Sequence, residues 1–229
     1  MYSVLHVRTA SRPTSDLTAR ARIIDAAVAV FAEQGASASM RAIAAAAGVS
    51  PGLITHHFGT KEALKAECDE RVLDTYTDMN MAGIADPIGS MDVLEETDPE
   101  QVRHMETLTQ YVMRAFLDGG PTAQQFYGRF LSRIRDIMTA AAASGMVRQI
   151  CADETYVRYL AASNLGFMLV QFVTDPPETS GGFYRHLMTH PALMEAMIDV
   201  LTSGVFTDDQ VLAGFRTAIN KKEKIEQNV

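Results

Sequence analysis

The sequence predicts an all-α protein, and three observations favour this fold class. Alanine-rich stretches, which have high helix propensity, recur along the 229 residues. Glycines and prolines divide the chain into segments of helix length. No run of alternating apolar and polar residues predicts a strand of any length. We therefore expect a chain built almost entirely of helices.

Start and stop signals place the expected helices in order. Capping residues at 14–16 start a helix that Gly35 closes, Ser39 and Ser50 cap two short helices, and Thr60 caps one that reaches about Met81. A loop or broken helix is expected over 83–97. The later helices are expected at 98–117, from 121 to near 145, and at 153–174, 183–189 and 191–203, with a last one capped at 207–209.

Composition excludes several classes of protein. The hydrophobic content of 47% and the charged content of 21% are ordinary for a globular chain. Cys68 and Cys151 are far apart and lack a pairing motif, which indicates a reducing compartment. Residues 1–14 lack the apolar core of a signal peptide, and the apolar run 160–173 is too short to span a bilayer. The sequence therefore predicts a soluble, cytoplasmic protein that does not enter membranes.

The charge is divided unevenly along the chain. Residues 1–66 contain seven Lys or Arg against four Asp or Glu, a net +3, whereas the remaining residues carry a net −11 within the total of −8. A basic first segment on an acidic body indicates two tasks in one chain.

Residues 40–59 have the pattern of a helix-turn-helix. Ala44 provides the small residue needed where two helices cross closely, and Gly48, four positions on, tolerates the positive φ of the turn. Ile43, Val49 and Ile54 are spaced to hold the two helices together, and Phe58 is expected to pack against the preceding helix. An alanine-rich helix pair with an intervening glycine also occurs in all-α proteins that do not bind DNA.

The second of these helices is expected to enter the major groove of double-stranded DNA. Its outward residues can reach base edges and phosphates, Gly52 allows close approach of the backbone, and the cations on either side can neutralise phosphates. The predicted DNA-binding residues are Arg41, Ser50, Pro51, Gly52, Thr55, His56, His57 and Lys61.

The first part of the chain closely resembles the DNA-binding head of the TetR family of transcriptional regulators. The strings that carry this resemblance are FAEQG (31–35), RAIA (41–44) and AGVSPGLITHHFGTKEAL (47–64). The resemblance covers about residues 17–65. Two departures are visible: Thr55 stands where the family commonly has Tyr, and the segment from Gly35 to Ile43 is one residue shorter than the commonest form.

The resemblance implies an Ω-like homodimer whose larger domain binds a small molecule and alters the spacing of the two heads. It implies a repressor of a pseudo-palindromic operator that a largely apolar effector releases. We accordingly expect a flexible arm over 1–15, a helix-turn-helix domain over 16–64, and a helical ligand-binding and dimerisation domain over 65–229.

Methionines and aromatic residues gather at helical spacings in the larger domain. Such side chains can line an adaptable apolar cavity, although the same stripes are typical of a plain core. The predicted ligand-binding residues are Met105, Tyr111, Phe126, Tyr127, Phe130, Asn164, Phe167 and Gln171. Dimerisation is expected through the helices at 153–174 and 191–203, because the first is apolar on more than one face.

Two alternatives remain at this point. A helix-turn-helix protein without a small-molecule effector, controlled by a protein partner, would keep the head and need no cavity. An all-α enzyme is less favoured because the sequence offers no catalytic constellation, phosphate loop or nucleophile elbow. No catalytic residue, cofactor or metal site is predicted; His186 and His190 lack a carboxylate partner at metal-site spacing.

Overall fold

The structure, a computed structural model, describes residues 19–86, 99–174 and 191–226, and every regular element in these ranges is a helix. The chain divides into two compact units, within 1–186 and 187–229. The first contains α1 (Ala19–Gln34), η1 (Gly35–Ser37), α2 (Met40–Ala47), α3 (Pro51–Phe58), α4 (Lys61–Ala85), α5 (Pro99–Leu117), α6 (Gly120–Ser144), η3 (Gln149–Ala152) and α7 (Glu154–Thr174). The second contains α9 (Pro191–Ser203) and α10 (Gln210–Glu226). The predicted all-α class is confirmed.

Most predicted boundaries agree with the structure to within a few residues. One expectation was wrong: the helix that starts at Lys61 does not stop near Met81 but continues through Gly83 to Ala85. A glycine in the last turn leaves the helical hydrogen bonds intact, and the Asp86 N–H still donates to the Ala82 carbonyl over 2.9 Å. The expected arm over 1–15 and the expected helix over 183–189 lie outside the described residues.

The first three helices form a small head around a shared apolar core. α1 contributes Ile23, Ala27 and Phe31, all buried, and packs against α2, α3 and α4. α1 also packs against α5, so that the head rests directly on the larger part of this unit.

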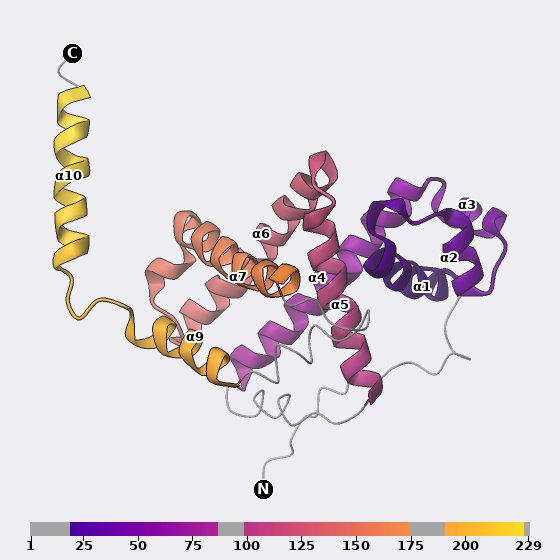
Figure 1. Ribbon diagram of the computed structural model, residues 1–229, viewed down its shortest axis with the longest axis horizontal. Coiled ribbons are helices and arrows are strands. Elements are labelled where there is room, and N and C mark those ends of the chain that lie inside the picture. The colour runs from indigo at the N-terminus through magenta and orange to yellow at the C-terminus, as the bar shows by residue number, and fades with distance from the viewer. Residues whose placement is uncertain (1–18, 87–98, 175–190, 227–229) are drawn as a thin grey trace, which may run out of the picture. The chain divides into compact units, whose positions relative to one another are not determined.

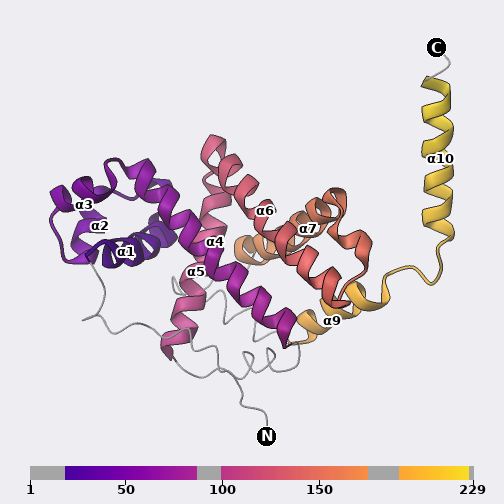
Figure 2. The same ribbon diagram turned by 180° about the vertical axis from the view of Figure 1, so that it is seen from behind.

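Helix α4 connects the head to the rest of the unit without a break. Its 25 residues make a rod of about 37 Å, and Figures 1 and 2 show it extending from the α1–α3 group toward α6. Cys68, on its head-proximal part, is completely buried, and burial raises the pKa of this thiol to about 12. The expected domain boundary at 64/65 falls inside this continuous helix.

Aromatic side chains fill the core between α5 and α6. Tyr111 and Phe126 lie with ring centroids 6.3 Å apart, and Phe116 makes edge contacts with Phe126, Tyr127 and Phe130 at 5.5, 6.0 and 6.1 Å. The predicted apolar stripes of these two helices therefore face each other in the interior.

Helix α7 covers this core with one face only. Val157, Ala161 and Leu165 are buried, whereas Tyr159, Val170 and Val173 on other faces are exposed by 69%, 56% and 62%. Within the described ranges, none of the helices combines the length and hydropathy that a membrane span requires.

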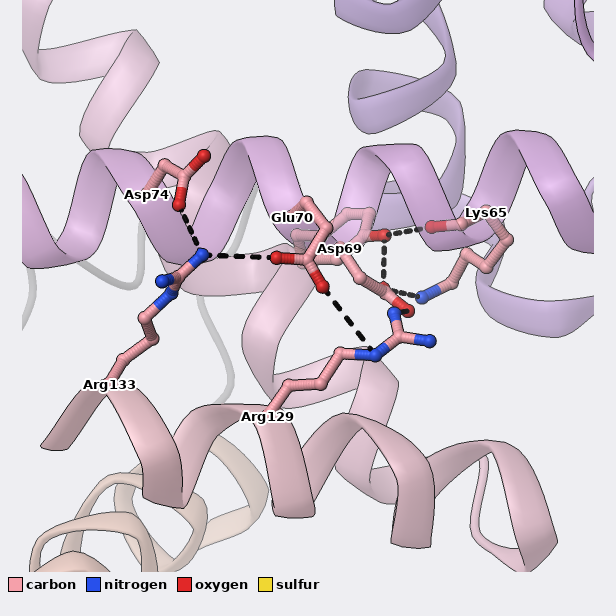
Figure 3. Close-up of polar contacts among 7 residues, drawn as sticks. Lys65, Asp69, Glu70, Asp74, Arg129 and Arg133 are labelled. Carbon is pink, nitrogen blue, oxygen red and sulfur yellow. Dashed lines mark hydrogen bonds and ion pairs between the residues drawn. The ribbon is translucent and has the colours of Figure 1, made fainter. Parts of the chain in front are cut away.

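A buried carboxylate, Asp69 on α4, joins three helices (Figure 3). Its Oδ1 accepts a hydrogen bond from the Tyr111 hydroxyl of α5 and an ion-pair contact from Lys65 Nζ, both at 2.6 Å. Its Oδ2 lies 3.4 Å from Nη1 of Arg129 on α6. Burial, followed by the Asp69 charge, raises the pKa of the Tyr111 phenol, so this group stays a protonated donor. We call Lys65, Asp69, Tyr111 and Arg129 the Asp69 cluster.

Replacement of Tyr111 by Phe tests this cluster. Removal of the hydroxyl leaves a buried carboxylate short of one donor, so we expect the free energy of unfolding in urea to fall by about 1–3 kcal/mol. Tyr127→Phe is the matched control, because the Tyr127 hydroxyl has no hydrogen-bond partner among the described residues. A loss in Tyr111→Phe no larger than in the control would show that the hydrogen bond contributes little.

Candidate nucleic-acid interface

The turn between α2 and α3 is defined by caps at both helices. Ser39 Oγ accepts a hydrogen bond from the Ala42 N–H at 3.1 Å and starts α2, and Ser50 Oγ accepts from the Leu53 N–H at 3.2 Å and starts α3. Gly48 ends α2 in the left-handed conformation, with φ +64°. These local interactions fix the turn at the positions that the sequence predicted.

Apolar residues hold the two helices together from beneath. Ile43, Ala44, Ile54 and Phe58 are buried, as the spacing predicted, while Val49 is half-buried against them. Arg20 of α1 lies with its guanidinium carbon 5.1 Å from the Phe58 ring centroid and pairs with Glu67. Arg20 therefore stabilises the head internally.

The opposite face of α3 is exposed along its whole length. Pro51, Gly52, Thr55, His56 and His57 are all exposed, as is Ser50 before them. The Thr55 hydroxyl donates to the Pro51 carbonyl at 3.2 Å, so its oxygen can still accept a hydrogen bond from outside. The predicted DNA-contact residues of this helix thus share one accessible surface.

Gly52 has no internal packing reason to lack a side chain. A Cβ at this position would meet only Ser50 Oγ, at 3.9 Å, which is ordinary van der Waals contact. Its backbone is helical, so a left-handed conformation does not require glycine either. The absent side chain instead leaves room above the helix, where another molecule can approach the backbone.

The two flanking cations differ in their surroundings. Arg41, in the first turn of α2, is exposed. Lys61, at the start of α4, is half-buried, and its Nζ donates to the carbonyls of Ala36 and Ala38 at 2.7 and 2.9 Å. Since an ammonium has three N–H donors, one remains for a phosphate while two hold the α1–α2 connection in place.

A contact that the sequence did not predict joins this connection to α5. The Asp118 carboxylate, just after α5, accepts a hydrogen bond from the Ala36 N–H at 2.7 Å. Gly35, with φ +58°, allows this approach, because a Cβ there would lie 2.6 Å from Asp118 Oδ1. No sequence signal links residues 82 positions apart, so only the structure could reveal this pair.

The predicted ligand-binding residues separate into three groups. Tyr111, Phe126 and Phe130 are buried in the α5–α6 core. Met105, Tyr127, Phe167 and Gln171 are half-buried, and Asn164 is exposed on α7. Phe116 contacts Phe126, Tyr127 and Phe130, and Tyr111 contacts Phe126, so the structure brings these four predicted residues together. Their role in ligand binding stays a prediction.

Sequence reasoning also missed the ion pairs between α4 and α6 (Figure 3). Arg133 contacts Glu70 at 3.1 Å and Asp74 at 2.5 Å, and Arg129 lies 3.6 Å from Glu70. The two acids on α4 are four residues apart, and so are the two arginines on α6. This matched spacing of acidic and basic residues was the sequence signal that could have predicted the ion pairs.

Comparison with known proteins agrees with this geometry. The family described as "Bacterial regulatory proteins, tetR family" matches residues 23–68, and "Tetracyclin repressor-like, C-terminal domain" matches residues 104–207. The HTH-type transcriptional regulatory protein RaaS of Mycobacterium tuberculosis is 29% identical over 88% of this chain and 93% of its own length. The regulator UidR of Escherichia coli is 45% identical over 60 residues, 26% of this chain and 28% of its own length.

Among solved structures, a Clostridium perfringens protein named for the regulation of fatty acid metabolism shares the fold. It is 17% identical and covers 82% of this chain and 100% of its own, with a TM-score of 0.50.

Gly52→Ala separates folding from DNA contact. We expect the free energy of unfolding to stay equal or rise by up to about 1 kcal/mol, because alanine favours helix and fits the site. DNA affinity should fall by about tenfold or more, which corresponds to about 1.4 kcal/mol, because the added methyl group obstructs the duplex. Gly128→Ala, at an open helical position of α6, is the control and should leave affinity unchanged. Unchanged DNA affinity in Gly52→Ala would show that α3 does not enter the major groove at this position.

Arg41→Gln and Lys61→Met test the phosphate contacts. Each should lower the magnitude of the slope of log affinity against log salt by about 0.9, measured by fluorescence anisotropy between 50 and 300 mM KCl, roughly the range in which counterion release is resolved. Lys61→Met should in addition destabilise the head, since the carbonyls of Ala36 and Ala38 lose their donor. Arg135→Gln, exposed on α6, is the control for lost charge. If the salt dependence of a variant has the same slope as that of the control, the tested residue does not contact a phosphate.

Proposed function

The chain belongs to the TetR family of helix-turn-helix transcriptional regulators, and from this premise we propose that it is a ligand-released repressor. In this proposal a homodimer binds a pseudo-palindromic operator in the cytoplasm, and a small, largely apolar effector releases it. The observation that carries the DNA-binding part is the exposed face of α3, which the caps and buried side chains of the head hold in a fixed orientation.

A fixed head can respond to the larger domain because three contacts connect them. α4 runs continuously from the head into the body, α1 packs on α5, and Asp118 at the end of α5 holds the Ala36 N–H. A displacement of α5 or α4 by an effector would therefore move α3 as well. This mechanical connection supports effector-controlled DNA binding.

The proposal of a homodimer is supported by apolar surface on the helices predicted to pair. Tyr159, Val170 and Val173 are exposed on α7, and Ile198 and Leu201 are exposed on α9. Large apolar side chains that remain in water on a regulatory domain are typical of a protein–protein contact. A two-fold dimer would present two α3 helices to two half-sites about one helical turn apart.

Selection of bound sequences from random double-stranded DNA tests the proposal. We expect the enriched sequences to contain an inverted repeat, and sedimentation of the complex should show two chains on one repeat. Enrichment of an asymmetric single site, or one chain on each site, would contradict the dimer.

Release of the selected operator by a panel of apolar small molecules then tests the effector. Release by at least one member at concentrations that leave the protein folded is the expected result. If no molecule releases DNA while DNA binding itself is intact, control by a protein partner becomes the better description.

A further inference from the structure

Three polar residues at a spacing of four run along the inner part of α5: Glu106, Gln110 and Arg114. Glu106 and Gln110 are exposed by only 5% and 8%. Arg114 is half-buried, and its Nε atom is out of contact with water and has no hydrogen-bond partner. Because residues four apart lie on one face of a helix, they form a polar stripe beside the apolar core.

Arg114 differs from the comparable arginines of this unit. Arg129 and Arg133, with side chains exposed by 34% and 32%, each contact carboxylates of α4. For Arg114 the described residues provide no such carboxylate. A half-buried cation with an unsatisfied N–H costs free energy, because water that was lost is not replaced by a hydrogen bond.

The surroundings of Arg114 suit a ligand with an apolar part and a flat anionic group. The guanidinium carbon lies 5.9 Å from the Phe172 ring centroid on α7, and Met168, one turn earlier on α7, is packed on the same core. The contact with the aromatic ring uses no N–H of the guanidinium, and the Nε N–H is left without an acceptor. A carboxylate fits the edge of a guanidinium with two parallel hydrogen bonds.

We propose that Arg114 is the recognition residue for the carboxylate of an amphipathic organic acid, whose apolar part lies against Phe172 and Met168. The proposal rests on the proposed function, because this acid would be the effector. One arginine balances the single charge of a carboxylate. A dianionic phosphate would leave one negative charge without a cation in this half-buried place, so the site favours the carboxylate.

Matched pairs of probes test the proposal on the full-length chain. Octanoate, dodecanoate and phenylacetate are each compared with the primary alcohol of the same skeleton, and affinity is measured from the shift of the thermal unfolding midpoint with ligand concentration. We expect at least one acid to bind about tenfold or more tightly than its alcohol, because a charge-assisted pair adds to the shared apolar contact.

Arg114→Met keeps a long apolar side chain and removes the guanidinium group. It should reduce the preference of acid over alcohol to less than about twofold, while the alcohol still binds. Its unfolding midpoint without any probe should not fall, because an unsatisfied cation is removed. Arg103→Met, exposed on the same helix, controls for the lost charge and should keep the preference. Arg114→Gln provides a second variant if the Met variant does not fold.

The outcomes separate this proposal from the one on which it rests. If no acid binds better than its alcohol, or if Arg114→Met and Arg114→Gln keep the preference, the carboxylate site is wrong even when an alcohol releases DNA. If acids bind through Arg114 but leave the operator complex intact, the site stands and ligand-released repression fails.

Discussion

The buried Asp69 carboxylate is the constraint on which the arrangement of the first unit depends. A carboxylate taken out of water must be surrounded by donors and cations, and here these come from three places on the chain: Lys65 on α4 itself, Tyr111 on α5 and Arg129 on α6. A rotation of α4 against α5 or α6 would separate Asp69 from Tyr111 or Arg129 and leave the charge with fewer partners than burial requires. The cluster therefore fixes the direction of the helix whose first turn belongs to the head.

Lys65 extends this constraint into the head. Its ammonium lies 5.7 Å from the Phe31 ring of α1, 4.4 Å from the Tyr111 ring and 5.6 Å from the Phe126 ring, while it pairs with Asp69. One cation thus contacts aromatic residues from both parts of the unit. One turn earlier, Lys61 holds the carbonyls of the α1–α2 connection, so consecutive turns of α4 secure the head at two points.

The sequence was sufficient where the determinant is local. Ser39, Gly48 and Ser50 mark the turn of the helix-turn-helix through hydrogen bonds that span three or four residues, and the structure confirms those positions. Phe126 and Phe130 belong to a stripe whose period predicts burial. By contrast, the hydrogen bond between Ala36 and Asp118 joins residues 82 positions apart, and the one between Asp69 and Tyr111 joins residues 42 positions apart. These pairings depend on how the helices pack. Gly83 was misjudged for a related reason: a glycine near a helix end does not reveal whether the helix stops before or after it.

Two of the interactions that hold α4 and α5 in place, the Asp69 cluster and the Asp118–Ala36 hydrogen bond, differ in how readily they can break. Asp69 and Tyr111 are buried, so their separation leaves the carboxylate in an interior that does not replace the lost donor with water. The Asp118–Ala36 hydrogen bond is exposed, so water can replace either partner when they separate. Of these two interactions, the Asp118 contact therefore costs less free energy to release than the Asp69 cluster when the head moves relative to α5. Gly35 serves the same contact, because its missing side chain permits the close approach of the Asp118 carboxylate to the α1–α2 connection.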